Sequence, residues 1–209
     1  MIYAENILIC ISVPLLISLI FVRGNTGKFV ASFIIGMAVC LISAYISGFI
    51  DLASHMGDED TAIFISPIVE EIMKLLPLLF YLLMFDPQDD SLHLCALGIG
   101  TGFATFENCC YILAQGADSL GYIMIRGMAV GVMHIVSIMA LSMAICISRR
   151  YKVLSAPAVL GALSLSMTYH GLYNLLVSEQ GITSYVGYVL PILTAVIMYF
   201  PFKRSRDME

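Results

Sequence analysis

Charged residues are scarce in this sequence. Asp, Glu, Lys and Arg make up 12% of the 209 residues, whereas the apolar and aromatic types make up 60%. The mean hydropathy of +0.94 is too high for a soluble domain, because a chain of this length has too little interior to hide so much apolar surface. The composition therefore argues against a water-soluble enzyme, a nucleic-acid-binding protein and a disordered protein. It indicates an integral membrane protein.

Basic residues are also few, with 10 Lys and Arg against 15 Asp and Glu and a formal net charge of −5. They form no patch for nucleic acid and no polybasic segment for anionic lipid. The six cysteines all lie in apolar stretches, where we expect small buried hydrophobic residues rather than a disulfide framework. The HExxH and GxSxG motifs of familiar hydrolases do not occur.

Seven apolar stretches are long enough to cross a membrane, which takes ~20 helical residues. They cover residues 6–22, 29–50, 61–85, 92–114, 122–148, 153–177 and 184–202. We therefore expect an all-α, polytopic membrane protein with about seven transmembrane helices, in which residues 1–209 form a single transmembrane domain. The first stretch follows a segment without positive charge, so we expect a retained helix rather than a signal peptide.

The loops differ in their content of Lys and Arg, which sets membrane orientation. Basic residues lie in the first loop, the fifth loop and the tail: Arg23, Lys28, Arg149, Arg150, Lys152, Lys203, Arg204 and Arg206. With seven spans, the first loop, the fifth loop and the tail lie on the same side of the membrane. Loops 51–60 and 178–183, on the other side, carry no Lys or Arg. The pattern predicts a protein of the cell membrane with its N-terminus outside and its C-terminus in the cytoplasm.

The third span contains three ionisable residues, although each such group costs ~2.5 to 3.5 kcal/mol inside a membrane. Glu70 and Lys74 are four residues apart on one helix face, so we expect them to form an ion pair, with Glu71 pointing about 100° away. One interpretation is that the trio neutralises itself and fixes helix packing. However, two carboxylates and one cation leave an acid uncompensated, which favours a chemical role.

The next three spans also carry polar residues. Glu107 has three possible roles: a buried acid that a neighbouring helix satisfies, a supporting residue of the site, or a residue with a direct chemical role. Arg126 either reaches the lipid headgroups or forms a salt bridge with a site carboxylate. Gly98 and Gly102 form a small-xxx-small pair that predicts a close helix contact. The remaining polar candidates are Asn108, His134, Ser137 (a weak candidate nucleophile), His170 and Asn174.

Helix rise predicts that the main candidates share one layer of the membrane. At ~1.5 Å per residue, Glu70 lies ~14 Å, Glu107 ~10 Å, His134 ~18 Å and His170 ~10 Å from the outer end of its helix. Such a set suits attack of an activated water on an amide, with neutral donors stabilising the oxyanion. The same groups would also bind a divalent metal such as zinc, through Glu70, His134 and His170.

The motifs, taken in order, resemble a known family. They are Glu70-Glu71-x-x-Lys74, the segment 102–111 with Glu107 and Asn108, Arg126 with His134, and His170-x-x-x-Asn174. This order is similar to that of the PrsW family of intramembrane proteases, which belongs with the CAAX prenyl endopeptidases and the bacteriocin-processing proteins. The resemblance covers residues 61–177, which places the protease core in helices 3 to 6.

The resemblance implies a catalytic role for Glu70, Glu71, His134, His170 and Asn174, supported by Lys74, Glu107, Asn108 and Arg126. Glu70 with His134 would activate the water, His170 and Asn174 would polarise the scissile carbonyl, and Glu71 with Lys74 would orient the first carboxylate. It leaves open whether a metal is needed. The implied partner is a membrane-anchored protein substrate, such as an anti-sigma factor cut near the outer leaflet.

Two other functions fit parts of the pattern. A CAAX-type prenyl-protein endopeptidase would open to the cytoplasm, whereas the polar layer here lies toward the predicted outer side. A proton-coupled transporter would need polar residues across the whole thickness of the membrane, and the inner halves of these spans are almost purely apolar. A membrane scaffold without activity is the remaining alternative.

Overall fold

The computed structural model describes residues 25–115, 120–151 and 155–207, and every regular element in these ranges is helical. The long helices are α2 (Thr26–Ser54), α4 (Ser66–Phe85), α5 (Asp89–Gln115), α6 (Leu120–Arg150), α7 (Ser155–Ser178) and α8 (Ile182–Asp207). A short helix α3 (Asp58–Asp60) and a π-helical turn η1 (Thr61–Ile65) lead into α4. The expected all-α class is therefore confirmed for the described residues.

The expected membrane spans correspond to these helices from the second span onward, while the first, 6–22, lies outside the described residues. By length and composition, three of the helices in the described part of the chain are apolar enough to cross a membrane: Thr26–Ser54, Gly121–Arg150 and Ile182–Phe200. The count of seven spans stays a prediction. α4 does not meet the same criterion, since its 20 residues carry Glu70, Glu71 and Lys74.

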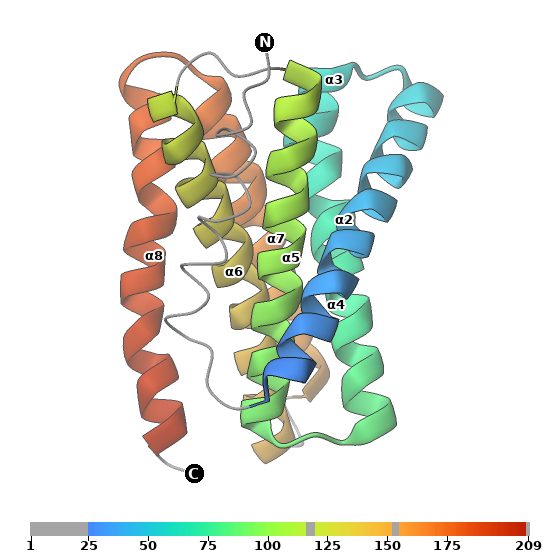
Figure 1. Cartoon of the computed structure of the whole chain (residues 1–209), viewed down its shortest axis with the longest axis vertical. Helices are drawn as coiled ribbons and strands as arrows, with labels where there is room; N and C mark the ends of the chain where they lie inside the picture. The colour runs from blue at the N-terminus through green and yellow to red at the C-terminus, as the bar shows by residue number, and fades with distance from the viewer. Residues whose placement is uncertain (1–24, 116–119, 152–154, 208–209) are drawn as a thin grey trace.

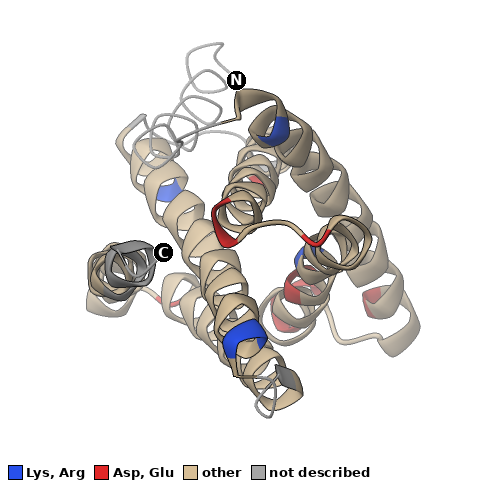
Figure 2. Cartoon of the chain, turned by 90° about the horizontal axis from the view of Figure 1, so that it is seen from below, with Lys and Arg blue, Asp and Glu red and all other residues tan. Residues whose placement is uncertain are grey.

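The helices run side by side, with α3 at one end of the bundle and the described C-terminal end of α8 at the other (Figure 1). α5 packs between α2 and α6, and α6 also contacts α7 and α8. α4 contacts α2 and α7 and so closes the ring. Figure 2 looks along the helix axes and shows how few charged segments the described helices carry.

Apolar side chains cover the outside of the bundle as well as its core. Large apolar side chains point outward, and Phe49, Leu83 and Ile197 are 72%, 78% and 67% exposed. Glu71 and Lys74, in contrast, are completely buried. An apolar exterior around a polar centre is the arrangement expected of a helical bundle in lipid.

Small residues allow α2 and α5 to approach each other closely, as the Gly98 and Gly102 spacing predicts. A Cβ atom at Gly98 would lie 2.8 Å from the carbonyl oxygen of Phe29, and one at Gly102 would overlap the backbone of Phe33. Gly36 of α2 meets the backbone of Ile99 in the same way. This contact fixes α5, which carries Glu107, against α2.

We predict that Gly102→Ala destabilises the protein by ~1 to 3 kcal/mol, because the added methyl group forces two backbones apart. The matched control is Gly48→Ala on α2, where no atom lies within 4 Å of an added Cβ. Thermal unfolding in detergent micelles measures both variants. Equal stability of the two variants would contradict the packing described for α2 and α5.

Candidate active site

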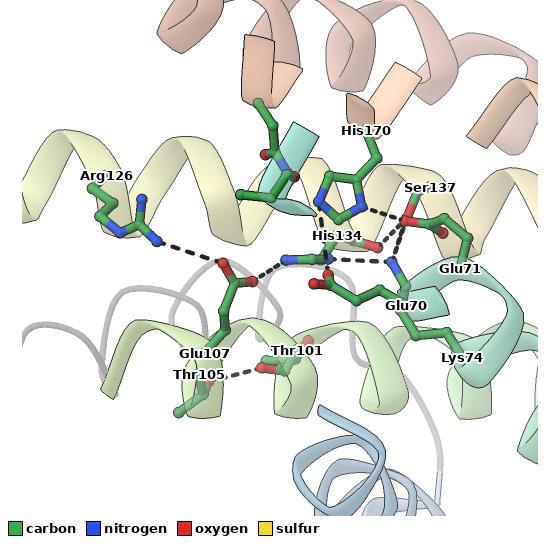
Figure 3. Close-up of polar contacts among 12 residues, drawn as sticks. Glu70, Glu71, Lys74, Thr101, Thr105, Glu107, Arg126, His134, Ser137 and His170 are labelled. Carbon is green, nitrogen blue, oxygen red and sulfur yellow. Dashed lines mark hydrogen bonds and ion pairs between the residues drawn. The ribbon is translucent and has the colours of Figure 1, made fainter. Parts of the chain in front are cut away.

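Four helices contribute side chains to one polar cluster inside the bundle (Figure 3). α4 supplies Glu70, Glu71 and Lys74, α5 supplies Glu107, α6 supplies Arg126 and His134, and α7 supplies His170. The residues expected to share one layer of the membrane therefore meet in space. The cluster lies on the four helices that the sequence assigns to the core.

Lys74 is the cation at the buried end of this cluster. Its Nζ donates to Glu71 Oε1 at 2.7 Å and to Ser137 Oγ at 2.9 Å, and lies 3.2 Å from His134 Nδ1. These three contacts use the three N–H bonds of an ammonium group. The expected ion pair between Glu70 and Lys74 is thus wrong, because Lys74 turns to the carboxylate three residues away instead of the one four residues away.

Glu71 also holds His170 from the other side. The carboxylate oxygen Oε1 that binds Lys74 lies 2.9 Å from His170 Nδ1. An ionised carboxylate only accepts hydrogen bonds, so Nδ1 carries the proton and the other ring nitrogen of a neutral histidine is left with its lone pair. That nitrogen, Nε2, faces Glu70 Oε2 at 3.7 Å.

Glu107 holds the second histidine in a similar way. Glu107 Oε2 makes a short hydrogen bond with His134 Nε2, and Glu107 Oε1 lies 3.5 Å from Nη2 of Arg126. The guanidinium of Arg126 also stacks 3.5 Å above the ring of Tyr111. The structure therefore favours the salt bridge, and not the headgroup contact, for Arg126.

The two histidines lie against each other. Their ring centroids are 5.0 Å apart with an interplanar angle of 88°, and the ring of Phe103 covers His134 at 4.7 Å. Each histidine thus has its own carboxylate partner, Glu71 for His170 and Glu107 for His134. This double support fixes both rings in one orientation.

Glu70 is the carboxylate that remains without a donor. Its Oε2 atom is buried and has no hydrogen-bond partner among the described residues, although the side chain as a whole is 16% exposed. Glu107 is 29% exposed, whereas the side chains of His134 and His170 are 0% and 2% exposed. Access to the cluster is therefore through the side that Glu70 and Glu107 border.

Some expected site residues are not brought into the cluster. Asn174 donates from Nδ2 to the carbonyl oxygen of Ala62 at 2.9 Å, so its amide serves the backbone of η1. Asn108 is buried, and its amide atoms have no hydrogen-bond partner among the described residues. Ser137 Oγ donates its proton to the carbonyl oxygen of His134, which is not a base that could activate a nucleophile.

The sequence did not predict the role of two further contributors, Phe103 and Ser137, of which Ser137 was considered only as a weak candidate nucleophile. Phe103 covers His134 and also lies 5.3 Å from Lys74 Nζ, and Ser137 is the third partner of that ammonium. Ser137 stands one helical turn after His134 and Phe103 one turn before Glu107, so periodicity places each on a site-facing side. Nothing in the residue types themselves distinguishes these two from ordinary packing residues.

Three side chains fit a divalent metal. Glu70, His134 and His170 each offer a ligand atom, and these atoms lie within 4.8 Å of one another. The unpartnered Glu70 oxygen and the His170 Nε2 that faces it are the features of a ligand set, and a Glu/His/His set is typical of zinc hydrolases. Both ring nitrogens of His134 have partners, so this residue would exchange one of them on binding a metal.

The comparisons with known proteins agree with this chemistry. Residues 25–202 match the family model described as PrsW family intramembrane metalloprotease. The match covers more than half of the chain and includes every residue of the cluster. No curated protein and no solved structure gives a significant match.

We predict that Lys74→Met destabilises the protein by ~3 to 5 kcal/mol, because Glu71 is left as a buried charge without its cation. The double variant Lys74→Met/Glu71→Gln removes both charges and should recover part of this loss. The free energy of unfolding in detergent is measured for the wild type, Lys74→Met, Glu71→Gln and the double variant. Strictly additive losses would contradict the ion pair as the main support of Glu71.

Proposed function

Since the chain belongs to the PrsW family of intramembrane metalloproteases, we propose that Glu70, His134 and His170 form the centre at which it hydrolyses a peptide bond. The observation that carries this proposal is the convergence of their three ligand atoms within 4.8 Å in a bundle with an apolar exterior. Glu71 and Glu107 orient the two histidines. Lys74 and Arg126 balance the charge of these two carboxylates.

Glu70, His134 and His170 would hold a divalent metal such as zinc. When bound, the metal supplies a Lewis acid that polarises the scissile carbonyl and makes a water molecule more acidic. The support of each histidine by a carboxylate matches this role, since a carboxylate partner fixes the ring and makes its other nitrogen a better ligand.

Glu70 is the group placed to move the proton. A carboxylate has two oxygens, so Glu70 can act as a ligand with one oxygen and receive the proton of the attacking water with the other. The water oxygen then bonds to the carbonyl carbon. When the C–N bond breaks, the proton on Glu70 passes to the leaving amine, which restores the carboxylate.

The substrate we propose is a membrane-anchored protein, such as an anti-sigma factor, cut near the outer leaflet. Glu70 lies just after η1, in the half of the bundle bordered by loops 55–57 and 179–181. Those loops lack Lys and Arg, whereas Lys28, Arg149 and Arg150 lie toward the opposite end. The positive-inside rule supports an outer location of the site, with the C-terminus in the cytoplasm.

We predict that Glu70→Gln lowers the rate of substrate cleavage at least ~10³-fold, since an amide keeps the shape of the side chain but cannot accept a proton. His134→Ala should lose activity to a similar extent. The assay follows cleavage of single-pass membrane proteins in reconstituted vesicles. Glu59→Gln, a substitution of an exposed glutamate in α3, is the matched control and should cleave normally.

Near-normal cleavage by both Glu70→Gln and His134→Ala would show that the proposed centre is wrong. Loss of activity in Glu59→Gln as well would point to a general effect on the protein rather than on the site. The unfolding temperature of each variant, measured in the same detergent, separates loss of chemistry from loss of folding.

The orientation is tested by cysteine labelling. In a background without the six native cysteines, we predict that Glu59→Cys and Glu179→Cys react with an impermeant thiol reagent in intact cells, whereas Tyr151→Cys does not. All three positions are exposed in the structure. The reverse pattern would place the site toward the cytoplasm and would favour a CAAX-type endopeptidase.

A further inference from the structure

The turn that leads into α4 has an irregular backbone. η1 (Thr61–Ile65) is π-helical, and the N–H of Ser66 donates to the carbonyl oxygen of Thr61, five residues back. The next bond of this series would join the N–H of residue 67 to the carbonyl oxygen of Ala62. Residue 67 is proline, which has no N–H to donate.

Asn174 supplies the donor that is missing. Its Nδ2 lies 2.9 Å from the carbonyl oxygen of Ala62, across a separation of 112 residues in the chain. The bond lies in an exposed part of the structure, so its role is to hold the turn and not to satisfy a buried group. The contact gives the carbonyl oxygen of Ala62 a donor where Pro67 has none.

α7 is shaped to reach this turn. A Cβ atom at Gly171 would lie 3.2 Å from the carbonyl oxygen of Ile63 and 3.9 Å from Pro67 Cγ, so the lack of a side chain lets the two backbones come together. His170, directly before Gly171 and one turn before Asn174, binds Glu71. α7 thus binds η1 through Asn174 and the first turns of α4 through His170.

The π turn sets the direction of the site carboxylates. One additional residue in a turn rotates everything that follows by about 100° around the helix axis. Glu70 and Glu71 follow Pro67 by three and four residues, so their direction depends on whether Ala62 keeps its π register. A relaxed turn would point Glu70 away from His134 and His170.

We propose that Asn174 is a positioning residue, which replaces the N–H that Pro67 lacks and thereby holds the π turn that aims Glu70 at the two histidines. The inference rests on the proposed role of Glu70 in hydrolysis. The two polar residues of the His170-x-x-x-Asn174 motif thus have different roles. His170 belongs to the proposed centre, and Asn174 keeps the π turn that precedes α4.

Rescue through the backbone tests the proposal. Asn174→Ala should lower kcat about 10-fold with a smaller change in KM, because without this hydrogen bond the turn keeps its π register less often. Pro67→Ala gives residue 67 an N–H that can serve Ala62, so the double variant Asn174→Ala/Pro67→Ala should recover at least half of the loss on a logarithmic scale. Pro67→Ala alone should stay within about 3-fold of the wild type, because Asn174 already satisfies Ala62.

Two controls accompany this cycle. Asn174→Asp keeps the size of the side chain but removes the donor, and it should behave as Asn174→Ala does. Thr168→Ala, on the same helix, removes a hydrogen bond to the carbonyl oxygen of Ser164 at 2.9 Å and should leave cleavage unchanged.

Hydrogen–deuterium exchange of peptides covering residues 58–70 gives a readout that does not depend on activity. Exchange should rise in Asn174→Ala and fall back in the double variant. The proposal would be overturned if the double variant showed no recovery of kcat and if exchange at residues 58–70 were unaltered in Asn174→Ala. Asn174 would then be assigned to polarisation of the scissile carbonyl. If Glu70→Gln keeps its activity, the proposed function fails, yet the exchange data still decide what Asn174 does.

Discussion

The buried ion pair between Lys74 and Glu71 is the interaction on which the rest of the site depends. Both side chains are fully buried, and removing either partner would leave a bare charge among apolar helices. The ion pair is the first contact of a chain. Lys74 binds Glu71, Glu71 binds His170, and His170 faces Glu70. A single cation thus organises side chains from α4, α6 and α7.

The apolar exterior makes this network both costly and useful. Lipid-facing residues offer no hydrogen bonds, so each polar group inside the bundle needs a partner from another helix. Glu71 with His170 and Glu107 with His134 meet that need in two similar pairs. Glu70 makes no such pair: its buried Oε2 has no hydrogen-bond partner among the described residues and lies next to two oriented histidines, which supports the proposed centre.

Hydrophobic stretches were sufficient to predict the helices, and helix rise was sufficient to predict that Glu70, Glu107, His134 and His170 meet. The partner of Lys74 was not predictable in this way, since residues three and four positions apart both lie on the same side of a helix. The contacts of Lys74 with His134 and Ser137 on another helix select Glu71 as its partner, and the spacing of residues along α4 does not predict such contacts. The site therefore contains most of the expected members, without Asn108 and Asn174, and Lys74 has a different partner from the expected one.

The position of Asn174 shows a second limit of sequence periodicity. A helix of constant 3.6-residue period predicts one direction for every side chain, and a π turn shifts all later directions by one residue. Pro67 was the only visible signal for this turn, and proline in the first turn is equally common in regular helices. The family resemblance implied that Asn174 polarises the scissile carbonyl, and no periodicity argument could show that its amide donates instead to the carbonyl oxygen of Ala62 in this turn.

The central claim is that Glu70, His134 and His170 act as one ligand set, and the metal content of the purified protein tests it most directly. Elemental analysis of protein prepared without chelators should find about one divalent metal per wild-type chain and a clear loss in Glu70→Gln, His134→Ala and His170→Ala. The control is His93→Gln, which alters a buried histidine bound to Ser142 on the same bundle but outside the cluster, and it should keep its metal. Full metal content in all three site variants, or equal loss in the control, would contradict the account.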